Sequence, residues 1–180
     1  LYPLFSGVHG IIGSLIKTSD EYALAVSTAL GGASNYLVVD DRKLASKMVN
    51  YLRDNKLGRA TFYPLDVIKA RYIDNDSLNK VSLANGYINT LDKIVTYDKK
   101  YENIIMNQLG NVILADNIDA ANKISEKVAN RYKIVTMDGQ VVNVGGSITG
   151  GDKVKNNDPI RQKYELNDYK DKVTKLINEN

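Results

Sequence analysis

The chain has 180 residues and a formal net charge of +3, and 43% of its residues are hydrophobic. That length is sufficient to bury the core of one compact domain or of two small ones, and no run of about 18 apolar residues is present that could span a membrane. The absence of cysteine excludes disulfide scaffolds, thiol catalysis and thiolate metal sites, and it favours a cytoplasmic protein.

The single histidine, His9, restricts the chemistry further. Zinc sites without cysteine usually use two or three histidines, and a serine-hydrolase triad needs one well-placed base. His9 lies between Val8 and Gly10 in a glycine-punctuated apolar segment, which favours a packing or capping role. No pair of carboxylates has a spacing that implies acid–base chemistry. We therefore expect no catalytic residue and no metal site.

The first half of the chain predicts a helix followed by a strand, a helix and a strand. Residues 20–30 have helical spacing of apolar positions, with acidic residues at the start and two glycines after the end. Residues 36–39 have the branched, apolar character of a buried strand. Asp40 or Asp41 then caps a helix, and residues 60–63 form the next strand, so a right-handed crossover is expected.

The second half repeats this plan. Residues 97–109 are predicted as a helix that a glycine ends, and residues 112–115 as a strand. Asp116 or Asn117 caps the next helix, and residues 132–136 form another strand.

An offset of 76 residues places residues 37–40 over residues 113–116 and Ala45 over Ala121. Two similar lobes joined by the polar residues 74–86 would explain this offset, and so would two independent strand–helix–strand units. The predicted fold class is α+β (mixed α/β), with mixed sheets and packed helices in two similar lobes.

The C-terminal segment changes character. Residues 152–158 are polar and loop-like, and Pro159 suits the first turn of a helix. The apolar positions that follow are spaced by three and four residues, as in a coiled-coil seam or on an ordinary surface helix: Leu166, Tyr169, Val173 and Leu176.

Four of the 13 glycines lie in residues 145–151. A nucleotide-binding loop is not indicated, because Asp152 stands where a Walker loop needs lysine. Glycine also lets two backbones approach closely, so residues 141–144 running into these glycines could present an open edge to another chain. A flexible linker is the alternative, although Ile148 between the glycine pairs offers a side chain for packing.

Several segments together resemble the hinge domain of structural-maintenance-of-chromosomes (SMC) proteins, most closely that of the homodimeric bacterial members. They occur in the family's order and extend over about residues 7–151. The segments are Gly7-Val8-His9-Gly10, residues 58–66, residues 134–139 and residues 145–151.

The resemblance implies four regions. Residues 1–6 would end an outgoing coiled-coil arm, residues 7–80 would form hinge subdomain I, and residues 81–152 would form subdomain II. Residues 153–180 would be the junction and the start of the returning helix of an antiparallel coiled coil. The first subdomain of one copy would pair with the second subdomain of the other in a ring-shaped homodimer. The implied dimer residues are Gly145, Gly146, Ser147, Ile148, Gly150 and Gly151.

The resemblance further implies a role in chromosome condensation and segregation, without catalysis or cofactors in this chain. ATP and magnesium would bind in the head domains of the full protein, kleisin-type subunits would bind elsewhere on it, and no membrane is involved. It also implies weak, non-specific DNA binding at the hinge–arm junction, for which Lys153 and Lys155 are the candidates. Because the net charge is small, the electrostatic attraction of DNA is expected to be modest. The alternative is a standalone DNA-binding domain with a glycine-rich linker.

Overall fold

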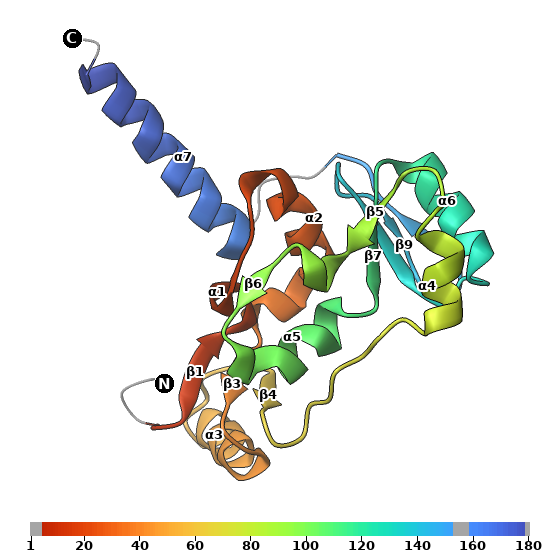
Figure 1. The fold of residues 1–180 in the computed structure, drawn as a ribbon. Coiled ribbons are helices and arrows are strands. Elements are labelled where there is room, and N and C mark those ends of the chain that lie inside the picture. The colour runs from red at the N-terminus through yellow and green to blue at the C-terminus, as the bar shows by residue number, and fades with distance from the viewer. Residues whose placement is uncertain (1–4, 153–158, 179–180) are drawn as a thin grey trace.

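The computed structural model describes residues 5–152 and 159–178. Two sheets are separated by a central layer of helices, and further helices cover their outer faces (Figure 1). The mixed α/β class and the two similar lobes are confirmed.

The first sheet lies in the first lobe. Its strand order is β1 (Val8–Ile11), β3 (Leu37–Val39) and β4 (Phe62–Pro64). Strand β3 is antiparallel to β1 and parallel to β4. Helix α3 (Arg42–Asp54) forms the crossover between the parallel strands, and it buries Met48 against Val39 on the outer face.

The second sheet has five strands. Their order is β10 (Ile148–Thr149), β9 (Val141–Val142), β8 (Lys133–Thr136), β7 (Val112–Ala115) and β5 (Tyr87–Thr90). Strands β7 and β8 are parallel, and the other neighbours are antiparallel. The crossover is helix α6 (Ile118–Lys127), which packs with Ile113 and Ile134 on the outer face.

One hydrophobic core runs between the two sheets. It contains residues of α1 (Ile12–Leu15), α2 (Asp20–Leu30) and α5 (Glu102–Leu109). Leu114 of β7 faces this core, whereas its neighbour Ile113 faces α6, as the alternation of side chains along a strand requires. The central layer therefore joins the lobes into one packed body.

The remaining elements are short or lie between the layers. Strand β2 (Ile16–Lys17) pairs with β6 (Thr96–Tyr97) as a separate ribbon. The 3₁₀ turns are η1 (Gly31–Asn35), η2 (Leu91–Lys93) and η3 (Lys99–Tyr101). The predicted helix over residues 97–109 is therefore wrong in its first part, because strand pairing and η3 precede α5.

The offset of 76 residues corresponds to equivalent hydrogen bonds in the two lobes. The carbonyl of Gly7 accepts the Asp40 N–H at 3.0 Å, and that of Gly86 accepts the Asp116 N–H at 2.8 Å. Both glycines have positive φ, and both sheets have a bulge just after them. The crossover helices are likewise capped by side chains 76 positions apart, Asp41 and Asn117. This agreement favours a structural repeat over two independent units.

The polar segment 74–86, expected to be a connection, contains helix α4 (Asn75–Val81). The Asp74 side chain caps it by accepting hydrogen bonds from the N–H and hydroxyl of Ser77, and it also accepts one from the Tyr132 hydroxyl. These bonds, with the nearby Arg131 guanidinium, hold the pKa of Asp74 well below its usual range. The predicted boundary between hinge subdomains I and II, between residues 80 and 81, falls inside α4. This division of the chain stays a prediction.

Helix α7 (Pro159–Asn178) projects away from the body (Figure 1). Its base is anchored by the buried Ile160 and by Tyr164, whose hydroxyl accepts the Thr18 N–H at 2.9 Å. Val173 and Leu176 of the predicted seam are exposed. Lys153 and Lys155 lie outside the described residues, as do residues 1–4 of the predicted outgoing arm.

Replacing Gly110 with alanine should destabilise the fold, because a Cβ there would lie 2.2 Å from the carbonyl oxygen of Arg71. Overpacking of this kind costs about 1–3 kcal/mol, so we expect a lower midpoint in urea unfolding. Gly32→Ala is the control, because a Cβ at Gly32 would meet nothing within 4 Å. Equal midpoints for the two variants would contradict close packing of residues 65–74 on the end of α5.

Candidate functional site

Strand β10 forms one edge of the five-stranded sheet, and within the described residues no strand pairs with its outer side. Ile148 is 57% exposed and Val144, in the turn before it, is 63% exposed. Of the predicted dimer residues, Gly146 is half-buried and the other five are exposed. The structure therefore brings all six together on one hairpin at a sheet edge.

Gly145 and Gly146 have a role within the chain that the sequence did not reveal. They form the turn between β9 and β10 with φ values of 90° and 102°, a conformation that favours glycine. The Gly145 N–H donates to the Asn130 carbonyl at 2.8 Å, and the Gly146 N–H donates to the Asn143 carbonyl at 2.9 Å. Substitution at either glycine would thus strain the hairpin as well as change its surface.

The Gln140 side chain holds the far end of β10, a contact that sequence reasoning missed. Its Oε1 accepts the Gly151 N–H at 2.8 Å, and its Nε2 donates to the Gly151 carbonyl at 3.2 Å. A Cβ at Gly150 would lie 1.8 Å from the same Oε1, so Gly150 makes room for this carboxamide. Only the fold reveals the pairing, since the two partners are eleven positions apart in the sequence.

The linker interpretation of residues 145–151 is wrong. Ile148 and Thr149 pair with Val142 and Val141 of β9. Asn143 adds side-chain hydrogen bonds to the Ser147 carbonyl and to the Thr149 hydroxyl. The segment is therefore a hydrogen-bonded hairpin.

The first lobe has an open edge at β4. In the structural repeat, β4 of the first lobe is the equivalent of β8 of the second. Strand β9 covers the outer side of β8, whereas no strand of the described residues covers that side of β4. A hollow of about 470 Å³ lies between this edge and α3, lined in part by Val49, Phe62 and Pro64. Val49 is 48% exposed, so this edge also has an apolar border.

His9 bridges two elements of the body. Its Nε2 lies 2.6 Å from Asp40 Oδ1, and its Nδ1 lies 2.9 Å from the hydroxyl of the buried Tyr101. The imidazole and Tyr101 rings also pack edge to face, which agrees with the predicted packing role. Within residues 5–152 and 159–178, no three His, Asp or Glu side chains are grouped as a metal site, and no helix is long and apolar enough to cross a membrane.

A model of the family described as "SMC proteins Flexible Hinge Domain" matches residues 5–125. The chain therefore belongs to the SMC hinge family. Among curated proteins it is similar to the chromosome partition protein Smc of Bacillus subtilis, with 37% identity over 174 residues, which are 96% of this chain and 14% of that protein. Because the chain spans so little of its relatives, whole-protein activities do not transfer to it directly.

The similarity to solved hinge structures extends over the hairpin, which lies beyond the family match. An asymmetric dimer of the Geobacillus stearothermophilus SMC hinge domain matches with a TM-score of 0.86 and 35% identity, covering 99% of this chain and 71% of that one. The Pyrococcus furiosus Smc hinge with an extended coiled coil matches with a TM-score of 0.70 and 29% identity, covering 97% and 62% of the two chains. The family and the bacterial likeness expected from the sequence are confirmed.

Gln140→Ala should loosen the end of the hinge's β10 edge, because the Gly151 N–H would lose its acceptor. Loss of one hydrogen bond costs about 1 kcal/mol, so amide hydrogen exchange at Gly151 should be about fivefold faster. The amide of Ile134, in the buried part of the same sheet, serves as the internal control. Unchanged exchange at Gly151 would contradict this role of the carboxamide.

Proposed function

We propose that this chain is the homodimerisation hinge of an SMC protein that acts in chromosome condensation and segregation. The observation that carries the proposal is the exposed edge of β10 with its apolar side chains Val144 and Ile148. Open sheet edges are normally blunted in monomers, because their free N–H and C=O groups pair readily with another chain. The β10 edge of each copy would therefore pair with a second copy of the chain.

The receiving surface in this proposal is the β4 edge of the first lobe. The repeat supports it, since the equivalent edge of β8 already accepts β9 within the chain. Val49 and Phe62 beside β4 would pack against Ile148 of the partner copy. Because each copy has both edges, a two-fold dimer would contain two equivalent interfaces and close as a ring.

In our proposal this chain contributes the start of one coiled-coil arm, and the other functions of the full protein lie in parts outside this chain. Helix α7 would begin the returning arm of an antiparallel coiled coil, and its exposed Val173 and Leu176 would meet the outgoing arm. ATP and magnesium would bind in separate head domains, kleisin-type subunits would bind elsewhere, and the hinge itself would catalyse no reaction. The protein would work with the chromosome in the bacterial cytoplasm.

Replacing Ile148 with aspartate should dissociate the dimer, because a carboxylate would be buried without a partner in the interface. We expect the dissociation constant to rise at least about 100-fold, with the folded monomer mass of 20.0 kDa measured by light scattering during size-exclusion chromatography. Leu83→Asp is the matched control, since Leu83 is 93% exposed and lies between α4 and β5, the strand at the opposite edge of the five-stranded sheet from β10. A dimer that survives Ile148→Asp as well as Leu83→Asp would refute pairing through β10.

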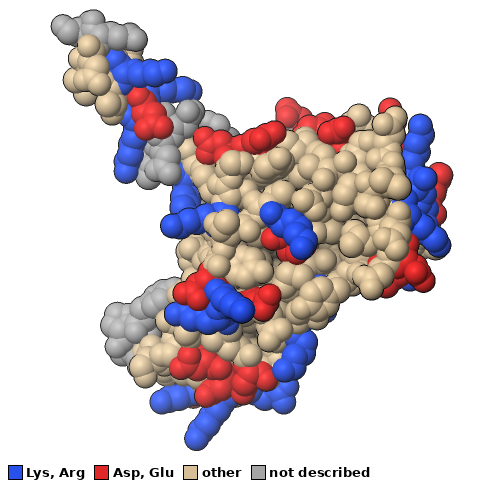
Figure 2. Space-filling view, viewed as in Figure 1, with Lys and Arg blue, Asp and Glu red and all other residues tan. Residues whose placement is uncertain are grey.

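We also propose that basic residues where the body meets α7 bind DNA weakly and without sequence specificity. Lys17 and Lys93 line one hollow of about 450 Å³ together with Thr18, whose backbone N–H is bonded to Tyr164 of α7. Lys153 and Lys155 from the sequence prediction belong to this proposal. Figure 2 shows basic and acidic side chains interspersed on the viewed face, in keeping with weak attraction.

Reversing the charge of Lys17 and Lys93 together should weaken binding to a random-sequence DNA duplex by about tenfold at low salt and lower the salt slope by about two. Fluorescence anisotropy over a salt series measures both quantities. Lys43→Glu with Lys80→Glu makes the same change in net charge at exposed positions elsewhere. Equal losses in the two double variants would mean that net charge alone determines binding.

A further inference from the structure

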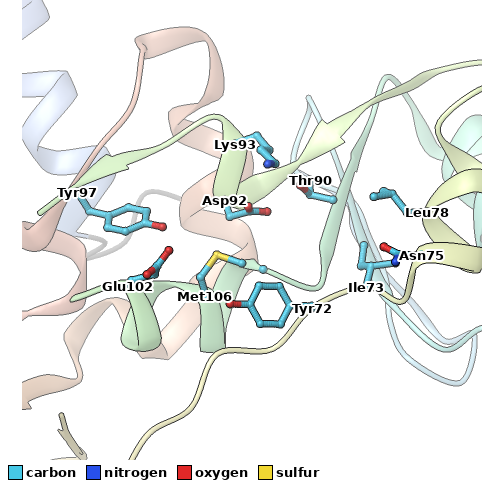
Figure 3. Close-up of a pocket in the computed structure, with 11 residues that line it drawn as sticks. Tyr72, Ile73, Asn75, Leu78, Thr90, Asp92, Lys93, Tyr97, Glu102 and Met106 are labelled. Carbon is cyan, nitrogen blue, oxygen red and sulfur yellow. The ribbon is translucent and has the colours of Figure 1, made fainter. Parts of the chain in front are cut away.

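The chain contains a single Asn-Gly dipeptide, Asn85-Gly86, in the turn between α4 and β5. The two elements on either side of this turn are held in the body, since Leu78 of α4 and Thr90 of β5 line one hollow (Figure 3). In the turn itself, Asn85 is exposed and Gly86 is half-buried. The asparagine side chain is therefore open to water.

The two groups of this dipeptide that can react with each other are both free of other contacts. Within the part of the chain that the structure describes, neither the Asn85 carboxamide nor the Gly86 N–H has a hydrogen-bond partner. Glycine has no Cβ, so no side chain on the same residue crowds the Gly86 nitrogen. A bond from this nitrogen to the side-chain carbonyl carbon of Asn85 would close a succinimide ring.

The comparable dipeptide Asp138-Gly139 is held by hydrogen bonds. The Gly139 N–H donates to the Thr136 carbonyl at 3.0 Å, and the Asp138 carboxylate accepts a hydrogen bond from the Thr136 hydroxyl. Ring closure at Asp138 would break both of these bonds, and each intramolecular hydrogen bond stabilises the folded state. No such bond opposes ring closure at Asn85, so the structure favours the reaction at one of two turns of similar sequence.

We propose that Asn85 is a site of spontaneous deamidation and isomerisation. The Gly86 nitrogen would attack the side-chain carbonyl carbon of Asn85 and form a C–N bond. The carboxamide C–N bond would break, and its amino group would leave as ammonia with the proton from the Gly86 nitrogen. Water would then hydrolyse one of the two ring C–N bonds of the succinimide. Cleavage at the side-chain carbonyl gives aspartate, and cleavage at the backbone carbonyl gives isoaspartate.

Either product changes the corner where this turn meets α6. The Gly86 carbonyl accepts the Asp116 N–H at 2.8 Å, and a Cβ at Gly86 would lie 2.4 Å from the Ala120 Cβ, so the backbone is closely packed there. Isoaspartate would add a methylene group to the main chain at this point. Both products would also place a carboxylate in a hollow that Asp116, Asp119 and Lys123 line, where like charges repel. The modified second lobe should therefore be less stable.

The structural repeat makes this site specific to the second lobe. Gly7 is the equivalent of Gly86, but the residue before it is Ser6, which has no carboxamide. The reaction needs no partner chain, and β5, to which the turn leads, lies at the opposite edge of the sheet from β10. Success or failure of this proposal is therefore independent of the dimer proposal.

The test is to incubate the intact folded chain in mildly alkaline buffer and to follow the mass of its peptides by mass spectrometry. Isoaspartate is detected by a purified isoaspartate methyltransferase that transfers a labelled methyl group from S-adenosylmethionine. We expect the mass gain of deamidation and the methyl label to grow with time in the peptide that contains Asn85. Asn85→Gln should lose both signals, because glutamine would have to close a larger ring, and its exposed position makes the variant harmless to the core.

The matched control is Asn79→Gln, which changes an exposed asparagine of α4 that precedes lysine instead of glycine. This variant should be labelled as the original chain is. After incubation of the original chain, the Asp116 amide should exchange about fivefold faster, which is the effect of losing one hydrogen bond, and incubated Asn85→Gln should not show this change. Equal labelling of Asn85→Gln and the original chain would overturn the proposal. An unlabelled folded chain would overturn it too, with the urea-unfolded chain as the positive control for the assay.

Discussion

The open edge of β10 is the constraint on which the account of this hinge depends. An edge strand leaves backbone donors and acceptors on one side without partners in the chain, and this one adds the exposed side chains of Val144 and Ile148. The carboxamides of Gln140 and Asn143 hold the hairpin in place from within. The edge is therefore fixed before a partner arrives, which lowers the ordering cost of association.

The central helical layer relates this edge to the rest of the molecule. Helices α2 and α5 pack between the two sheets, so one hydrophobic core joins the sheets that carry the β4 and β10 edges. The base of α7 contacts the same core through Ile160, and Tyr164 binds the backbone of Thr18. The base of α7 is therefore part of the packed body.

Local signals predicted much of this fold. The strand over residues 112–115 was predicted at its observed bounds because a short branched run between a glycine and a capping residue is unambiguous. The β2–β6 ribbon was missed because pairing distant in the sequence determines it. Helix α4 was missed although its cap is local, because its Asn, Asp and Ser residues are also typical of a connection. The sequence identified the glycine-rich edge. It could not reveal that the Gln140 side chain hydrogen-bonds Gly151 at the end of that edge, because the fold alone brings the two residues together.

Because the chain contains no cysteine, site-specific cross-linking tests the pairing of β10 with β4 most directly. The experiment mixes two single variants and treats them with a short bismaleimide. One variant is Ile148→Cys on the β10 edge, and the other is Ala60→Cys just before β4. The account predicts covalent dimers in the mixture and few in either variant alone, detected by gel electrophoresis under denaturing conditions. Cross-linking of Ile148→Cys to itself, with none added by Ala60→Cys, would show that β10 pairs with its own counterpart and would contradict the account.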